Sequence, residues 1–124
     1  MSTDIRMGAV TPILRMYDIE RTKSFYLDFL GFELQWEHRF EDGFPLYMAV
    51  ALGACTLHLS EHHGDCTPGS AVRIELSDVE AYQAKLLGTG YGYARPGIER
   101  TPWQTIELQV TDPAGNRLVF AQPA

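Results

Sequence analysis

The stretches "PILRMYDIERTKSFYLDFLGF" (12–32) and "VRIELSDVEAYQAKLLGTGY" (72–91) follow one plan, and this repetition decides the fold. In each stretch an apolar run typical of a strand leads to an aspartate, Asp18 or Asp78, and then to a helical pattern. Each aspartate is a typical helix N-cap, because its carboxylate accepts hydrogen bonds from the free amides of the first turn. Glycines then indicate the end of each helix. The sequence therefore predicts two copies of one structural unit.

Runs that read as strands follow each predicted helix, with turn residues between them. In the first copy these runs span 32–40, 45–52 and 54–60. In the second copy they are a weak run near 91–95 and stronger runs at 103–110 and 116–121. The segment "DPAG" (112–115) has the proline and glycine positions of a turn.

The order of elements predicts an α+β fold, since a short sheet with one helix on one face leaves the other face uncovered. We expect a single domain over 1–124, made of two βαβββ modules that form a curved mixed sheet with a concave cleft. The modules span about 8–60 and 71–122, and the polar segment 61–70 links them. Although this linker contains "EHHGDC" (61–66), adjacent histidines on a loop do not have a preorganised metal-ligand spacing.

Strand alternation assigns side chains to the two faces of the predicted sheet. Aliphatic residues would lie beneath the helices, and the other set would line the cleft. The predicted cleft residues are His58, Arg73, Glu75, Trp103, Thr105 and Glu107. Trp103 suits an aromatic ligand, although packing at the rim or in a subunit interface is an alternative. Trp36, Phe40 and Tyr47 are further candidates, with the same alternative.

Composition excludes several classes of partner. The formal net charge of −6 argues against nucleic acid, because that affinity depends on clustered lysine and arginine. No apolar run approaches the roughly 20 residues of a membrane span. The first residues lack the apolar core of a secretory signal, so we expect a cytoplasmic location, with Cys55 and Cys66 reduced.

The chain resembles the vicinal oxygen chelate superfamily, which includes glyoxalases, extradiol dioxygenases, fosfomycin-resistance enzymes and bleomycin-resistance proteins. The resemblance rests on the doubled plan and on "RMYDIERTKSFYLDFLGFE", "TPW" and "VTDPAGNRLVF", and it covers nearly the whole chain. It is strongest for the bleomycin-resistance branch, in which "PWG" and "DPAGN" recur. Here "PWQ" departs from that pattern by one residue.

Metal-dependent members of this superfamily carry ligands at four positions that can be matched one by one. The resemblance places Thr11 and His58 at the two positions of the first module, and Arg73 and Val119 at those of the second. A catalytic metal needs about three protein ligands, so His58 alone is insufficient. Arg73 would also place a positive charge where the ion should bind. The sequence therefore predicts no metal and no other cofactor.

The resemblance implies a homodimer that sequesters an antibiotic without altering it. We expect a metal-independent protein that binds a small, cationic and aromatic molecule, similar to bleomycin, in an aromatic cleft at the dimer interface. Glu75 or Glu107 would supply negative charge, unless these two carboxylates and Arg73 form a buried network of ion pairs. The alternatives are a metal-dependent lyase or oxidoreductase of the glyoxalase or dioxygenase kind, and an interaction module whose own side chains close the cleft.

Overall fold

The computed structural model describes residues 4–124 and contains two four-stranded sheets, one from each predicted module. The strand order is β1-β4-β3-β2 in the first sheet and β5-β8-β7-β6 in the second. In both, the outer strand β1 or β5 pairs in parallel with the last strand of its module, and the other pairings are antiparallel. The two βαβββ modules are confirmed, as two sheets instead of one continuous sheet.

The first module has short elements. Their bounds are β1 Ile13–Arg15, α1 Ile19–Lys23, a π-helix Ser24–Phe29, β2 Glu33–His38, β3 Tyr47–Leu52 and β4 Cys55–Ser60. Asp18 caps α1, and its side chain accepts a hydrogen bond from the backbone amide of Arg21.

The second module repeats this order with a longer helix. Its elements are β5 Ala71–Glu75, α2 Val79–Leu87, β6 Ile98–Arg100, β7 Thr105–Thr111 and β8 Arg117–Pro123. Asp78 caps α2 by accepting from the amide of Ala81, so both predicted N-caps are confirmed.

The strand predicted near 91–95 is wrong, because β6 begins only at Ile98. Gly90 has a positive φ of 77°, and 91–97 contains two further glycines and Pro96. Pro96 has no backbone N–H to donate, and its ring restricts the residue before it. The chain therefore pairs with β7 only after this segment.

The π-helix was not predicted, and it turns a run of aromatic residues into the core. The backbone amide of Leu30 donates to the Phe25 carbonyl at 2.9 Å, one residue beyond the α-helical partner. Phe25, Tyr26 and Phe29 are all nearly inaccessible to solvent. Phe29 stacks on Tyr91 of the second module, with ring centroids 4.5 Å apart.

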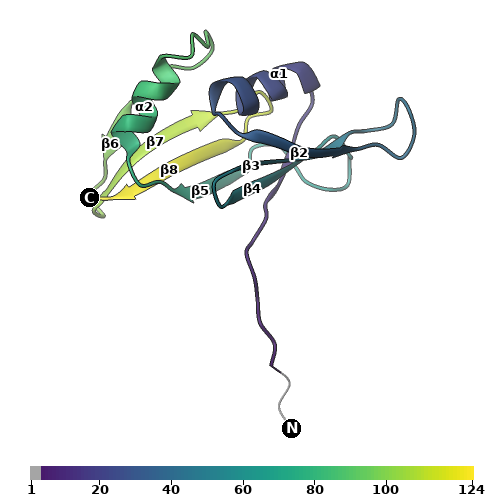
Figure 1. The fold of residues 1–124 in the computed structure, drawn as a ribbon, viewed down its shortest axis with the longest axis horizontal. Helices are drawn as coiled ribbons and strands as arrows, with labels where there is room; N and C mark the ends of the chain where they lie inside the picture. Colours follow the sequence, from purple (N-terminus) through teal and green to yellow (C-terminus); the bar gives the residue numbers. More distant parts are fainter. Residues whose placement is uncertain (1–3) are drawn as a thin grey trace.

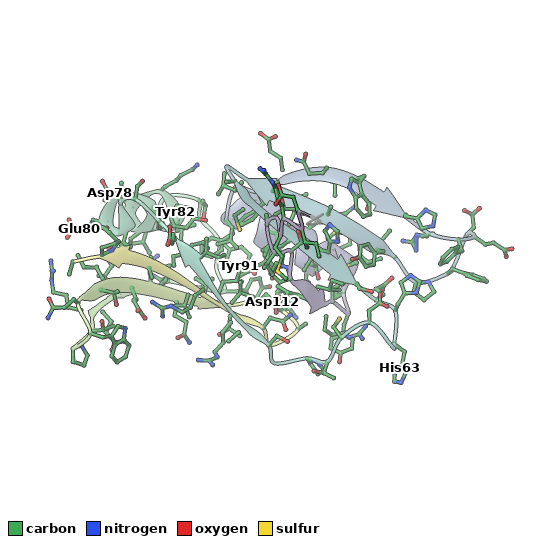
Figure 2. The ribbon with its side chains drawn as sticks, turned by 90° about the horizontal axis from the view of Figure 1, so that it is seen from below. His63, Asp78, Glu80, Tyr82, Tyr91 and Asp112 are labelled. Atoms are coloured by element: carbon green, nitrogen blue, oxygen red, sulfur yellow. The ribbon has the colours of Figure 1, made fainter. Side chains whose placement is uncertain are left out.

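Three hydrogen bonds join the modules across this core. The Tyr26 hydroxyl donates to Asp112 at 2.7 Å, and the Tyr82 hydroxyl donates to the Leu30 carbonyl at 2.7 Å. The side-chain amide of Asn116 donates to the Arg15 carbonyl at 2.9 Å. In Figure 2, Tyr91 and Asp112 lie in the middle of the molecule, where the halves meet.

Both helices lie on the same side of the strands (Figure 1), which leaves one face of each sheet uncovered. We call these uncovered faces the open faces. The arm 4–12 extends away from the body on the side opposite the helices (Figure 1), and Ile5, Met7 and Val10 on it are more than four-fifths exposed. Within 4–124, no helix is both long and apolar enough to cross a membrane.

Candidate functional site

The open face of the first sheet carries a cluster of aromatic rings. Trp36 and Tyr47 come from neighbouring strands and stack in parallel, with centroids 5.7 Å apart and planes 9° apart. The His58 ring meets both edge-on, at 5.2 Å from each. We call Trp36, Tyr47 and His58 the first-sheet cluster. It forms because Trp36 and His58 both lie opposite the small Ala49, which leaves room for the rings to meet.

The Tyr47 hydroxyl and His58 Nδ1 are 2.7 Å apart and share a hydrogen bond. This contact occupies one nitrogen of the imidazole and fixes the plane of the ring. Burial, and then the negative charge of Asp65, raise the pKa of the Tyr47 hydroxyl, so it stays protonated at neutral pH.

Phe40 lies beside this cluster and not inside it. Its ring meets His38 at 5.0 Å and His62 at 6.1 Å, and it is 72% exposed. Sequence reasoning missed His38 and His62. Alternation could have found His38, since it is two residues beyond Trp36 and opposite Tyr47.

The open face of the second sheet carries a polar cluster centred on Glu107. Its Oε2 accepts hydrogen bonds from Arg73 Nη2 at 2.9 Å, Thr105 Oγ1 at 2.7 Å and Trp103 Nε1 at 3.2 Å. We call Arg73, Trp103, Thr105 and Glu107 the second-sheet cluster. The indole of Trp103 is held by the hydrogen bond at its nitrogen. Because the residue is 61% exposed, much of the ring surface remains in solvent.

These donors change the acidity of Glu107. The hydrogen bond from Arg73, followed by that from Thr105, lowers the pKa of the Glu107 carboxyl to about 2. Burial opposes this effect, and the Trp103 contact adds to it. Glu107 is therefore a carboxylate throughout the neutral range.

The predicted buried network of Arg73, Glu75 and Glu107 is wrong in two respects. Only Arg73 and Glu107 form an ion pair, and the Arg73 side chain is 54% exposed. Glu75 lies on the same face of β5 as Arg73, two residues further along the strand, and its partner on β8 is Ala121. In the part of the chain that the structure describes, the Glu75 side chain forms no hydrogen bond or ion pair.

Three of the four positions matched to metal ligands lie on the open faces, and the fourth, Thr11, lies on the arm before β1. Arg73 and Val119 are direct partners in the second sheet, and His58 pairs with Ile13, two residues beyond Thr11. These residue types do not fit a divalent metal, because only His58 has a ligand atom of the right kind. Between residues 4 and 124, no three His, Cys, Asp or Glu side chains are grouped so that they could hold an ion.

The linker is tethered by the buried Arg15. Its guanidinium donates to the carbonyls of Ser60, His63 and Cys66. Ser60 Oγ also donates to Asp65 at 2.7 Å. His63 lies at the outer edge of the molecule in Figure 2. Burial raises the pKa of both cysteine thiols, which keeps them in the unreactive thiol form.

Within one chain, seven of the nine predicted site residues thus form two separate clusters, one on each sheet, and Phe40 and Glu75 lie outside them. A family model described as "Glyoxalase superfamily protein" matches residues 1–124. The chain belongs to the glyoxalase superfamily. This agrees with the vicinal oxygen chelate resemblance seen in the sequence. No curated protein matches this sequence.

Several solved structures share the fold over nearly the full length. A bleomycin-binding protein from bleomycin-producing Streptomyces verticillus, in complex with copper(II)-bleomycin, is 28% identical with a TM-score of 0.72. The match covers 98% of this chain and 100% of that one. The neighbours therefore include proteins that bind an antibiotic.

Two solved structures of lower identity show the fold alone. The antibiotic binding protein TnmS3 from Streptomyces sp. CB03234 is 24% identical, with a TM-score of 0.72 and coverage of 98% of this chain and 100% of that one. A glyoxalase family protein from Bacillus anthracis is 15% identical, with a TM-score of 0.69 and coverage of 99% and 100%. Superfamily membership alone therefore does not choose between binding and catalysis.

Proposed function

We propose that this protein binds a small aromatic molecule without a metal, in a cleft that a second copy of the chain completes. The observation that carries the proposal is the presence of one ring-bearing cluster on the open face of each sheet. A flat ligand could contact Trp36 and Tyr47 on one side and Trp103 on the other. The ligand would be held by contacts alone and released unchanged.

The exposure of these rings supports a binding role over packing within the chain. Trp36 is 47% exposed and Trp103 is 61% exposed, while the rings of the core are almost fully buried. An indole in water has apolar surface that a ligand or a partner can cover. The hydrogen bonds at Trp103 Nε1 and Tyr47 Oη hold both rings ready for this contact.

A homodimer is supported by the amount of apolar surface that one chain leaves uncovered. Ile13, Phe44, Trp36 and Trp103 are between 42% and 61% exposed, and the arm 4–12 adds three apolar side chains that are exposed almost completely. Two copies related by a twofold axis could bring the first-sheet cluster of one chain to the second-sheet cluster of the other. Each dimer would then contain two equivalent clefts.

The residues at the four ligand positions support independence from metal. Pairing two chains cannot supply the missing donors, since each cleft would still be built from threonine, histidine, arginine and valine. The bleomycin-binding relative suggests the class of ligand, a bulky antibiotic with aromatic and cationic groups. Glu75, whose carboxylate is unpaired within 4–124, could meet a cationic group.

Titration with metal-free bleomycin tests this function while the emission of Trp36 and Trp103 is followed. We expect saturable quenching, at least about tenfold weaker binding in Trp103→Ala, and a similar loss in Trp36→Ala. Tyr17→Ala is a matched control, because Tyr17 is exposed but belongs to neither cluster. Unchanged affinity in both tryptophan variants would contradict a cleft lined by these rings.

The alternative is a metal-dependent enzyme, since the superfamily that the sequence resembles includes glyoxalases and dioxygenases. Elemental analysis of the purified protein separates the two functions. A divalent transition metal bound in stoichiometric amount, and lost in His58→Ala, would establish the enzyme class. The third alternative, a closed interaction module, predicts no saturable quenching by any small aromatic molecule.

A further inference from the structure

Arg73 presents a guanidinium with unused hydrogen-bond donors on the open face of the second sheet. Among the described residues, only its Nη2 donates, and the acceptor is Glu107 at 2.9 Å. The side chain is 54% exposed, so Nη1 and Nε remain available. A guanidinium can bind a carboxylate through two parallel N–H bonds, and such pairs are among the stronger contacts in proteins.

A hollow of about 320 Å³ lies next to this guanidinium. Its lining includes Arg73, Glu75, Thr105, Ala121 and Pro123. The register explains the hollow: Ala121 lies directly between Glu75 on β5 and Glu107 on β7, and its small side chain fills little of the space. The volume is at the lower end of the range for small-molecule sites.

The two carboxylates beside the hollow differ in their state. Three donors converge on Oε2 of Glu107, so this carboxylate orients Arg73 and Trp103 and is already paired with the Arg73 cation. The Glu75 carboxylate has no hydrogen-bond or ion-pair partner within 4–124. One face of strand β5 therefore presents the unused N–H groups of Arg73 and, two residues further on, the unpaired carboxylate of Glu75. Residues two apart on a strand face are roughly 7 Å apart.

We propose that this hollow binds the zwitterionic head of an aromatic compound, of the kind found in an aromatic α-amino acid. The ligand carboxylate binds Arg73, its ammonium group binds Glu75, and its ring stacks against Trp103. Glu107 is a positioning residue for Arg73 and Trp103. This inference rests on the proposed function and names the head group that the second sheet selects.

The test uses three probes with one phenyl ring and different charges. They are L-phenylalanine, which is zwitterionic, 3-phenylpropionate, which has only the carboxylate, and phenethylamine, which has only the ammonium group. Tryptophan emission reports binding, since none of the probes absorbs at the red edge of the tryptophan band. We expect L-phenylalanine to bind at least about tenfold more tightly than either of the others.

Two variants separate the two charge contacts. In Arg73→Gln we expect L-phenylalanine to bind no more tightly than phenethylamine. In Glu75→Gln we expect it to bind no more tightly than 3-phenylpropionate. Ala121→Leu fills the hollow without changing any charge and is expected to weaken all three probes. Arg100→Gln removes one positive charge from a residue opposite Ile106, on the covered face, and is expected to change nothing.

Equal affinity of the wild type for all three probes, or an unchanged preference in Arg73→Gln, would overturn the inference. Bleomycin binding without any response to the phenyl probes would also overturn it, while leaving the proposed function intact. Saturable, Arg73-dependent binding of L-phenylalanine without bleomycin binding would support the inference and restrict the ligand class. If neither bleomycin nor any of the three probes binds, both the inference and the proposed function are wrong.

Discussion

The carboxylate of Glu107 has a different role from the one its sequence position suggests. As a polar residue on a cleft face it is a candidate for binding a cation, yet three donors from its own sheet converge on one of its oxygens. It acts instead on its neighbours, because it orients both the guanidinium of Arg73 and the indole of Trp103. A negative charge on a predicted cleft face is therefore not by itself a ligand contact.

The acidity of Glu107 gives a test at the scale of one residue. Because its pKa in the folded protein, about 2, is below the ordinary value of about 4.3, its favourable contribution to stability is complete above pH 4.3. This contribution is lost as the pH falls toward 2. We expect the carboxyl carbon shift of Glu107, measured by NMR, to change little between pH 7 and about pH 4.

Arg73→Gln removes the largest cause of this shift, so the midpoint should move up toward the ordinary value. The same variant should move the indole N–H resonance of Trp103, since both groups bind the same oxygen. Arg100→Gln is the matched control for the loss of charge. An unchanged midpoint in Arg73→Gln would show that the ion pair does not control Glu107.

At the scale of the elements, the two modules are joined through a short π-helix and the turn before β8. The turn is built on Asp112, whose carboxylate accepts from the backbone amides of Ala114 and Asn116 and from the side-chain amide of Asn116. The Tyr26 hydroxyl completes the set from the other module. Burial, and then the charge of Asp112, raise the pKa of Tyr26 well above its usual value.

This network predicts a graded loss of stability. Tyr26→Phe removes one donor from a buried carboxylate and should cost about 1–3 kcal/mol of unfolding free energy. Asp112→Ala leaves the Tyr26 hydroxyl and the amides that bind Asp112 without an acceptor. It should lower the free energy of unfolding by about 3 kcal/mol or more. Urea unfolding measures both.

Asp78→Ala, which removes an exposed helix cap, is the reference and should cost about 1 kcal/mol. A Tyr26→Phe protein as stable as the wild type would mean that this hydrogen bond contributes nothing. The pKa of Tyr26 is higher in the folded protein than in the unfolded chain. The stabilisation that its hydroxyl provides is therefore complete below about pH 10 and should decline as the pH rises above it.

The elements differ in how far the sequence predicts them. Strands β3, β4, β7 and β8 have alternating or continuous apolar runs, and both helices have aspartate caps, so local patterns are sufficient there. The strand β6 was misplaced because its pairing with β7 is long-range and its own pattern is short. The π-helix has no periodic signal, since it arises from packing of Tyr26 and Phe29 against the other module.

The candidate site was predictable in its faces and not in its contacts. Period-two alternation correctly places Arg73, Thr105 and Glu107 on one open face. It does not reveal that Arg73 reaches Glu107 across the intervening strand β8, where Arg73 is opposite Val119 and Glu107 is opposite Ala121. It also does not reveal that Arg15 is buried and tethers the linker.

At the scale of the whole molecule, the exposed rings and the arm 4–12 predict a dimer. Light scattering after size exclusion should give about twice the 13.9 kDa of one chain. Met7→Asp and Val10→Asp place charges on the arm and should shift the equilibrium toward the monomer, whereas Glu20→Gln, exposed on α1, should not. A wild-type protein that stays monomeric at high micromolar concentration would contradict a shared cleft.

Calorimetric titration of chelator-stripped protein with metal-free bleomycin determines whether ligand binding needs a metal. We expect saturable binding of about one ligand per chain, with an isotherm that overlays that of the untreated protein. His58→Ala should alter the affinity only through the lost ring contact. Binding that disappears on stripping and returns with a stoichiometric divalent metal would mean that the cleft depends on a metal ion.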